Sequence, residues 1–139
     1  MATAREIMTS DPQCIGENDT LIDAARLLAR IDVGAVPICG EDQRLKGMLT
    51  DRDIVVKALA TGKDPSTTTA GSLATGSVVW VDADADANAA MQLMRDHQVR
   101  RLPVISDHRL VGIISQADLA RHVDEGKVGD LVEAISAAP

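Results

Sequence analysis

The chain has 139 residues, a formal net charge of −7 and 45% apolar residues, with one tryptophan and no tyrosine or phenylalanine. This length allows one ordinary domain or two very small ones, built around an aliphatic core. The acidic charge and the lack of aromatic side chains argue against nucleic-acid partners. No apolar run is long enough to span a bilayer, and the N-terminus lacks a secretory signal, so we expect a cytoplasmic protein with no membrane partner; export by a route without a signal peptide stays open.

The same series of predicted elements occurs twice along the chain, in the order β-α-β-β-α. The first copy has a strand at 12–15, a helix that begins at Asp19 or Thr20, strands at 36–39 and 45–49, and a second helix capped by Thr50 or Asp51. The second copy has a strand at 78–81, a helix that begins at Asp86 or Asn88, strands at 102–105 and 110–114, and a second helix capped by Ser115. Helical and alternating apolar spacing predict these elements.

The two copies also align residue by residue. Val33–Ile38 matches Val99–Val104, and Arg44–Thr50 matches Arg109–Ser115. Residues 61–69 are rich in Gly, Pro, Ser and Thr, which is typical of a linker. We therefore predict domains at 4–60 and 70–124 and a C-terminal tail at 125–139 that forms a short helix.

A run of hydrophobic-x-x-hydrophobic-Pro-hydrophobic, followed by Leu-x-Gly-hydrophobic-hydrophobic-Thr/Ser-x-x-Asp, occurs in both copies. In these residues the chain resembles the CBS domain family. The fragments Ile38–Gly40, Gly47–Val55 and His97–Arg101 resemble the stand-alone CBS pairs of the hypoxic response type in actinobacteria. The resemblance implies an α/β fold in which two β-α-β-β-α CBS repeats pack pseudo-symmetrically through their sheets. It also implies a homodimer joined through helices, and the Met and Ala content of the first helix of the second copy (Ala89, Ala90, Met91 and Met94) fits close helix packing there. It further implies a regulatory or sensor role in a stress response.

In related CBS pairs, a Thr or Ser hydroxyl meets a phosphate and the following Asp holds a ribose, in clefts between the repeats. The resemblance implies that Thr50 and Asp53 form one adenine-nucleotide site and that Ser115 and Asp118 form the other. A strand-to-helix junction also presents backbone N–H groups that suit a phosphate. The alternative stays open, because Ser/Thr-x-x-Asp is equally a capping box that starts a helix. In that case the clefts are vestigial, and the chain is a structural or interaction protein that acts on a partner protein.

Two further pairs of residues carry alternatives. Cys14 and Cys39 map to strands that a CBS module places side by side and parallel, which implies a disulfide; the alternative is two buried thiols in a reducing compartment. His97 and His122 map to helices that pack together, so they are candidate zinc ligands, completed by a carboxylate, a water or a second molecule; the alternative is two surface residues. His108 falls in a hairpin turn.

No phosphate loop, nucleophile elbow or catalytic triad is present in the sequence, so we predict no catalytic residues and no enzyme activity.

Overall fold

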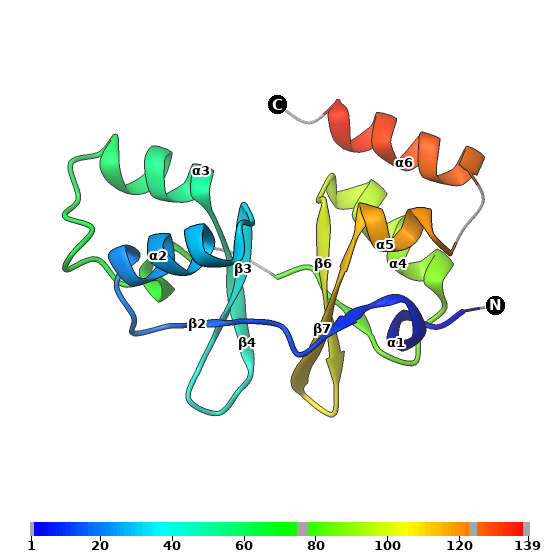
Figure 1. Cartoon of the computed structure of the whole chain (residues 1–139), viewed down its shortest axis with the longest axis horizontal. Coiled ribbons are helices and arrows are strands. Elements are labelled where there is room, and N and C mark those ends of the chain that lie inside the picture. The colour runs from blue at the N-terminus through cyan, green and yellow to red at the C-terminus, as the bar shows by residue number, and fades with distance from the viewer. Residues whose placement is uncertain (1, 75–77, 123–124, 138–139) are drawn as a thin grey trace. The chain divides into compact units, whose positions relative to one another are not determined.

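The computed structural model describes residues 2–74, 78–122 and 125–137, and of residues 125–128 only the backbone. Residues 75–77, 123–124 and 138–139, which fall in the predicted second repeat and tail, lie outside the described residues. The chain forms two compact units: a central unit of Gln13–Val78, and a composite unit that joins Met1–Pro12 to Val79–Pro139. Both are mixed α/β, each with its own sheet and helices (Figure 1).

The central unit contains a three-stranded sheet in the order β2-β3-β4, in which β2 is parallel to β3 and β4 is antiparallel to it. Its strands are β2 (Ile15–Gly16), β3 (Ala35–Cys39) and β4 (Leu45–Thr50). Its helical segments are α2 (Leu21–Ile31), α3 (Asp51–Asp53), which runs on into η1 (Ile54–Leu59), and η2 (Gly71–Leu73). The aliphatic core of this unit contains Leu21, Ile38 and Leu49, which are fully buried.

Local sequence explains where α2 begins and ends. The Thr20 hydroxyl accepts a hydrogen bond from the Asp23 N–H, and the Asp23 carboxylate accepts one from the Thr20 N–H, both at 3.2 Å. This capping box satisfies two donors that the helix itself leaves unpaired. The helix stops at Asp32, whose φ of 55° is left-handed. The predicted helix start at Thr20 is therefore correct.

The composite unit contains a four-stranded sheet in the order β1-β7-β6-β5. Its strands are β1 (Thr9–Ser10), β5 (Val81–Asp82), β6 (Arg101–Ser106) and β7 (Arg109–Ser115), and its helices are α1 (Ala4–Ile7), α4 (Ala87–His97), α5 (Gln116–Ala120) and α6 (Glu125–Ser136). Asp86 caps α4 and Ser115 caps α5, as the sequence predicts. Helix α6 packs on α4 and α5 and is the outermost of the three in Figure 1.

Strand β1 is an element that the sequence analysis missed. Thr9 and Ser10 pair antiparallel with Ile113 and Gly112 of β7, so the first residues of the chain complete a sheet formed by its second half. A Cβ atom on Gly112 would lie 2.7 Å from Met8 Cγ and 2.9 Å from the Thr9 carbonyl oxygen. In the central unit, a Cβ atom on the equivalent Gly47 would lie 2.7 Å from Ala74 Cβ. Each Leu-x-Gly motif therefore needs glycine at this position, because a side chain there would collide with the segment that crosses the strand.

The first predicted strand of each repeat starts later than expected, at Ile15 and at Val81. Pro12 has no N–H with which to join a ladder, which fits the later start of the first one. In the described part of the chain, no helix is long and apolar enough to cross a membrane.

Candidate functional site

The first predicted ligand site lies where β4 ends and α3 begins. The Thr50 hydroxyl accepts a hydrogen bond from the Asp53 N–H at 2.9 Å, and Asp53 Oδ2 accepts one from the Thr50 N–H at 3.1 Å. The other carboxylate oxygen, Asp53 Oδ1, lies 3.2 Å from Lys57 Nζ one helical turn later. The Asp53 side chain is 21% exposed. One oxygen therefore serves the helix cap, and the other pairs with Lys57, whose side chain is 48% exposed.

The backbone donors at this junction are already occupied, contrary to the expectation that they are free for a phosphate. The Asp51 N–H donates to the Gly34 carbonyl oxygen at 2.9 Å, and the Arg52 N–H donates to Asp51 Oδ1 at 2.8 Å. The Asp53 N–H is bound to Thr50. A phosphate would have to break these bonds and approach the Asp51 and Asp53 carboxylates, and both requirements disfavour it.

The second predicted ligand site lies where β7 ends and α5 begins, and it contains the same capping box. Asp118 Oδ2 accepts hydrogen bonds from the Ser115 N–H at 2.9 Å and the Ser115 hydroxyl at 3.1 Å. Asp118 Oδ1 lies 3.4 Å from the Thr9 hydroxyl and 3.7 Å from Arg121 Nη2. The Asp118 side chain is only 7% exposed. Among the described residues, Asp118 is the one buried charged group.

The structure therefore brings Thr50 to Asp53 and Ser115 to Asp118, in two closely similar arrangements. Both pairs start helices, as the capping alternative requires. They differ in access, because the Asp53 carboxylate is three times as exposed as that of Asp118. Of the two, Thr50 and Asp53 are better placed to meet a ligand.

Three polar neighbours of these carboxylates escaped the sequence analysis. Lys57 stands four residues after Asp53, a spacing that indicates an ion pair on a helix and was a usable signal. Arg121, three residues after Asp118, carried the same kind of signal. Thr9 is 109 residues from Asp118, and no local pattern predicts its contact.

The two cysteines lie close together as free thiols. Cys14 directly precedes β2 and is exposed, so its predicted place inside the strand is wrong; Cys39 ends β3 and is buried. A hydrogen bond between the two side chains lowers the pKa of Cys14 and raises that of Cys39, and burial raises the pKa of Cys39 further. A disulfide between the two cysteines requires this proximity. The alternative of two buried thiols holds for Cys39 but not for Cys14, which is exposed.

The two histidines predicted to bind zinc both belong to the composite unit and are exposed. His97 is the last residue of α4, as expected. His122 is not within the second helix, as we predicted, because α5 ends at Ala120. Its Nδ1 lies 3.0 Å from the Asp118 carbonyl oxygen. No group of three or more His, Cys, Asp or Glu side chains within the described ranges is arranged to hold a metal ion.

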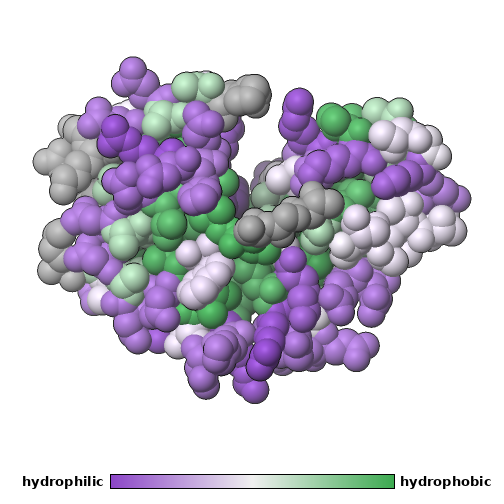
Figure 2. Space-filling view, turned by 180° about the vertical axis from the view of Figure 1, so that it is seen from behind, coloured by the Kyte–Doolittle hydropathy of each residue, from purple (hydrophilic) through white to green (hydrophobic). Residues whose placement is uncertain are grey.

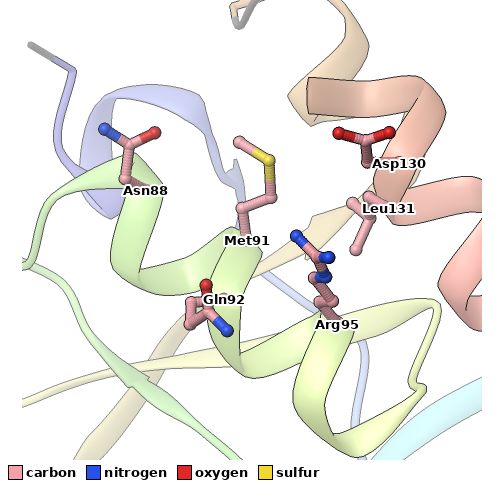
Figure 3. Close-up of a pocket in the computed structure, with 6 residues that line it drawn as sticks. All are labelled: Asn88, Met91, Gln92, Arg95, Asp130 and Leu131. Carbon is pink, nitrogen blue, oxygen red and sulfur yellow. The ribbon is translucent and has the colours of Figure 1, made fainter. Parts of the chain in front are cut away.

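A pocket of about 270 Å³ lies between α4 and α6. Figure 3 shows Met91 and Arg95 on α4 and Asp130 and Leu131 on α6 around it; Asn88 and Gln92 complete its lining. None of the four predicted ligand residues lines this pocket. It is instead a gap in the contact between two helices.

Repeated strand-to-helix junctions, each with a Thr/Ser-x-x-Asp box, on two small α/β sheets are the features of a tandem CBS-domain protein. The CBS domain profile matches residues 4–59 and residues 70–125, so the chain belongs to the CBS domain family. It is 55% identical over 135 residues to hypoxic response protein 1 of Mycobacterium tuberculosis, which covers 97% of this chain and 94% of the relative.

Two solved structures extend the comparison. A crystal structure of hypoxic response protein I with two coordinated zinc ions is 55% identical and matches with a TM-score of 0.83, covering 88% of this chain and 100% of that one. A CBS domain pair in complex with 5′-methylthioadenosine and S-adenosyl-L-methionine is 27% identical and matches with a TM-score of 0.75, covering 87% of this chain and 94% of that one.

Proposed function

We propose that this chain is a non-catalytic regulatory protein of the cytoplasm that binds an adenosine-containing small molecule through Thr50 and Asp53. The observation that carries the proposal is the Asp53 carboxylate, which keeps one oxygen accessible at a helix N-terminus, next to Lys57. A carboxylate in this position can accept hydrogen bonds from the two hydroxyls of a ribose. Ser115 and Asp118 form the corresponding second site, with less access to the carboxylate.

The surroundings of Asp53 favour an adenosine ligand without a phosphate. The three backbone donors of residues 51–53 are already hydrogen-bonded, and Asp51 adds a second negative charge. The CBS pair solved with 5′-methylthioadenosine and S-adenosyl-L-methionine holds two ligands of this kind. We therefore expect these two compounds to bind this chain more tightly than AMP does.

Replacing Asp53 by Asn tests this site. Asparagine keeps an acceptor for the Thr50 N–H, so the helix cap survives, but the charged acceptor for the ribose hydroxyls is lost. We expect the dissociation constant for 5′-methylthioadenosine to rise at least about tenfold, the effect of losing one charge-assisted hydrogen bond. Titration calorimetry measures the constant, and the fluorescence of the single tryptophan, Trp80, offers a second signal.

The matched control is Asp23→Asn, because Asp23 forms the same capping box with Thr20 outside the predicted site. This variant should bind as the wild type does. If Asp53→Asn and Asp23→Asn bind equally well, Asp53 is a helix cap and nothing more. If no adenosine compound binds the wild type, the second candidate function takes the place of the first.

The second candidate is a structural or interaction protein whose ligand sites are vestigial and whose fold is stabilised by zinc and a disulfide. The complete capping boxes and the low exposure of Asp118 favour it. We propose His97 and His122 as zinc ligands. The Asp118 carbonyl oxygen holds the Nδ1 side of His122, which leaves Nε2 as the metal-binding atom, an arrangement typical of zinc-bound histidine. The metal would supply a structural link, completed by water or by a second molecule.

We expect zinc to bind the wild type and to be retained by His108→Ala, whose histidine lies exposed in a hairpin turn. His97→Ala and His122→Ala should each weaken zinc binding by at least about tenfold, because each removes one of two protein ligands. Titration calorimetry with Zn²⁺ and metal analysis after dialysis measure this. Equal zinc content in all three alanine variants would remove both histidines from the metal site.

We also propose a homodimer, but its contact surface must lie elsewhere than on the residues of α4 that the sequence indicated. Of the four residues of α4 expected at the dimer contact, Ala90, Met91 and Met94 are buried in the core of the composite unit, and Ala89 alone is exposed. In the central unit, Val55, Val56 and Leu59 of η1 are 55%, 45% and 51% exposed. These three residues form an apolar strip on the surface of η1. Hydrophobic side chains also lie among hydrophilic ones on the face of the molecule that Figure 2 shows. A strip of this kind on a small acidic protein is a candidate contact with a second copy. Light scattering measures the mass directly.

A further inference from the structure

Helix α6 adds one wall to a pocket of the second repeat. The helix begins at Glu125, the residue at which the match to the CBS domain ends, and it packs on α4 and α5. Its buried residues Leu131 and Ile135 belong to the same core cluster as Met91 and Met94 of α4. The contact between α4 and α6 leaves the pocket of about 270 Å³ open (Figure 3). One wall of this pocket therefore comes from outside the repeats.

The lining of the pocket combines apolar and charged side chains. Met91 and Leu131 are buried and form its aliphatic part. Arg95 of α4 and Asp130 of α6 are exposed, so the two helices contribute one positive and one negative charge. Figure 3 shows the Arg95 side chain reaching from α4 toward α6. Apolar surface with a few polar groups around it is the usual lining of a small-molecule site.

The two charged groups have no protein partner. Among the described residues, neither the Arg95 guanidinium nor the Asp130 carboxylate takes part in a hydrogen bond or an ion pair. Gln92 is held in place, because its side-chain Nε2 donates to Asp96 Oδ1 at 2.7 Å. This bond leaves the amide oxygen of Gln92 as an acceptor. The pocket thus offers one cationic donor, one anionic acceptor and one neutral acceptor.

The size and chemistry of the pocket define the ligand. Pockets for drug-sized ligands measure about 300 to 1,000 Å³, so a pocket of about 270 Å³ suits a smaller molecule than an adenosine compound. A carboxylate is a preferred partner of arginine, which it meets through two parallel hydrogen bonds. An ammonium group is the matching partner for the carboxylate of Asp130. A free amino acid carries both groups on one carbon atom.

We propose that the pocket between α4 and α6 binds a free α-amino acid with an aliphatic side chain. The ligand carboxylate pairs with Arg95, the ammonium group pairs with Asp130, and the aliphatic side chain packs over Met91 and Leu131. This site is additional to the adenosine site, because the pocket belongs to the composite unit and Asp53 belongs to the central unit. Each of the two proposals can therefore fail without the other.

Binding at this pocket should also stabilise α6. The helix contains Gly126 and Gly129 within twelve residues, and glycine is a poor helix former. An isolated helix of this length is marginal in water, so α6 depends on its contact with α4 and α5. A ligand that contacts both α4 and α6 binds only the packed helix and therefore favours it.

The first test uses L-leucine as the probe, on the full-length chain. Two analogues each lack one of its charges: 4-methylpentanoate has no ammonium group, and 3-methylbutylamine has no carboxylate. Titration calorimetry should show that L-leucine binds. The dissociation constant of each analogue should be at least about tenfold higher, the effect of losing one charge-assisted contact.

The second test uses variants. Arg95→Gln and Asp130→Asn each remove one charge from the pocket and should raise the dissociation constant for L-leucine at least about tenfold. Arg100→Gln and Glu133→Gln are the matched controls, because both residues are exposed and lie outside the pocket lining, and these variants should bind as the wild type does. Hydrogen exchange followed by mass spectrometry should show that L-leucine slows exchange of the α6 amides in the wild type and the controls, but not in Arg95→Gln.

Three results would overturn the proposal. The first is no binding of L-leucine at millimolar concentration, or equal binding by the wild type and Arg95→Gln. The second is binding of 4-methylpentanoate as tight as that of L-leucine, because Asp130 would then select no ammonium group and the ligand would not be an amino acid. The third is unchanged exchange of the α6 amides on binding, which would place the ligand elsewhere than between α4 and α6.

Discussion

Oxidation of Cys14 and Cys39 to a disulfide is expected to raise the free energy of unfolding by about 3.5 kcal/mol, the chain-entropy value for a closed loop of this length. The two thiols lie close together, because Cys39 ends β3 and Cys14 directly precedes β2, the strand that pairs with β3. Cys14 is the exposed thiol and Cys39 the buried one, so an added oxidant reaches Cys14 first, and the Cys39 side chain beside it lowers the pKa of Cys14. Formation of the bond removes two protons and two electrons, which an added oxidant such as oxidised glutathione accepts. Urea unfolding with and without reductant measures the difference.

Cys14→Ser is the control for the cysteine experiment, because Cys14 is exposed and its replacement leaves the core intact. The oxidised wild type should be more stable than this variant, and the reduced wild type should match it. Alkylation followed by mass spectrometry checks the bond itself. If both thiols are alkylated in protein kept without reductant and exposed to the oxidant, the pair does not form a disulfide.

Gly112→Ala is expected to lower the free energy of unfolding by about 1 to 3 kcal/mol, the usual cost of adding a methyl group to a tightly packed place. The new Cβ atom would lie 2.7 Å from Met8 Cγ and 2.9 Å from the Thr9 carbonyl oxygen. Part of that contact is backbone, which cannot turn aside as a flexible side chain does. We therefore expect β1 to be displaced from β7, and the loss to appear in urea unfolding.

The control for Gly112→Ala is Gly129→Ala, the same change at a glycine whose Cβ would be in open space. This variant should be as stable as the wild type or more stable by up to about 1 kcal/mol, because alanine is the better helix former. The amides of α6 should also exchange more slowly. If the two alanine variants lose the same stability, the close approach of Met8 and Thr9 is not what Gly112 accommodates.

The local structure of the candidate site, its two capping boxes, could be predicted from the sequence. Thr50 and Ser115 start helices and pair with Asp53 and Asp118, because a capping box is a local contact between residues three apart. The same analysis expected free backbone donors at the first junction, where the structure shows Gly34 accepting from the Asp51 N–H. Gly34 lies between α2 and β3, so its bond to the Asp51 N–H depends on tertiary packing, whereas the bonds of the Arg52 and Asp53 N–H groups to Asp51 and Thr50 are local.

The sequence by itself determined the duplication, the helix caps and the aliphatic composition of the two cores, because each follows from short-range patterns that repeat in register. Only the tertiary structure decided which residues meet across long stretches of the chain. It placed Thr9 beside Asp118, crossed Met8 over Gly112 and buried Ala90, Met91 and Met94 in the core, where we expected a dimer surface. It also laid α6 on α4 and α5 and left Val55, Val56 and Leu59 exposed. These outcomes depend on which surfaces bury one another, and no spacing within one repeat carries that information.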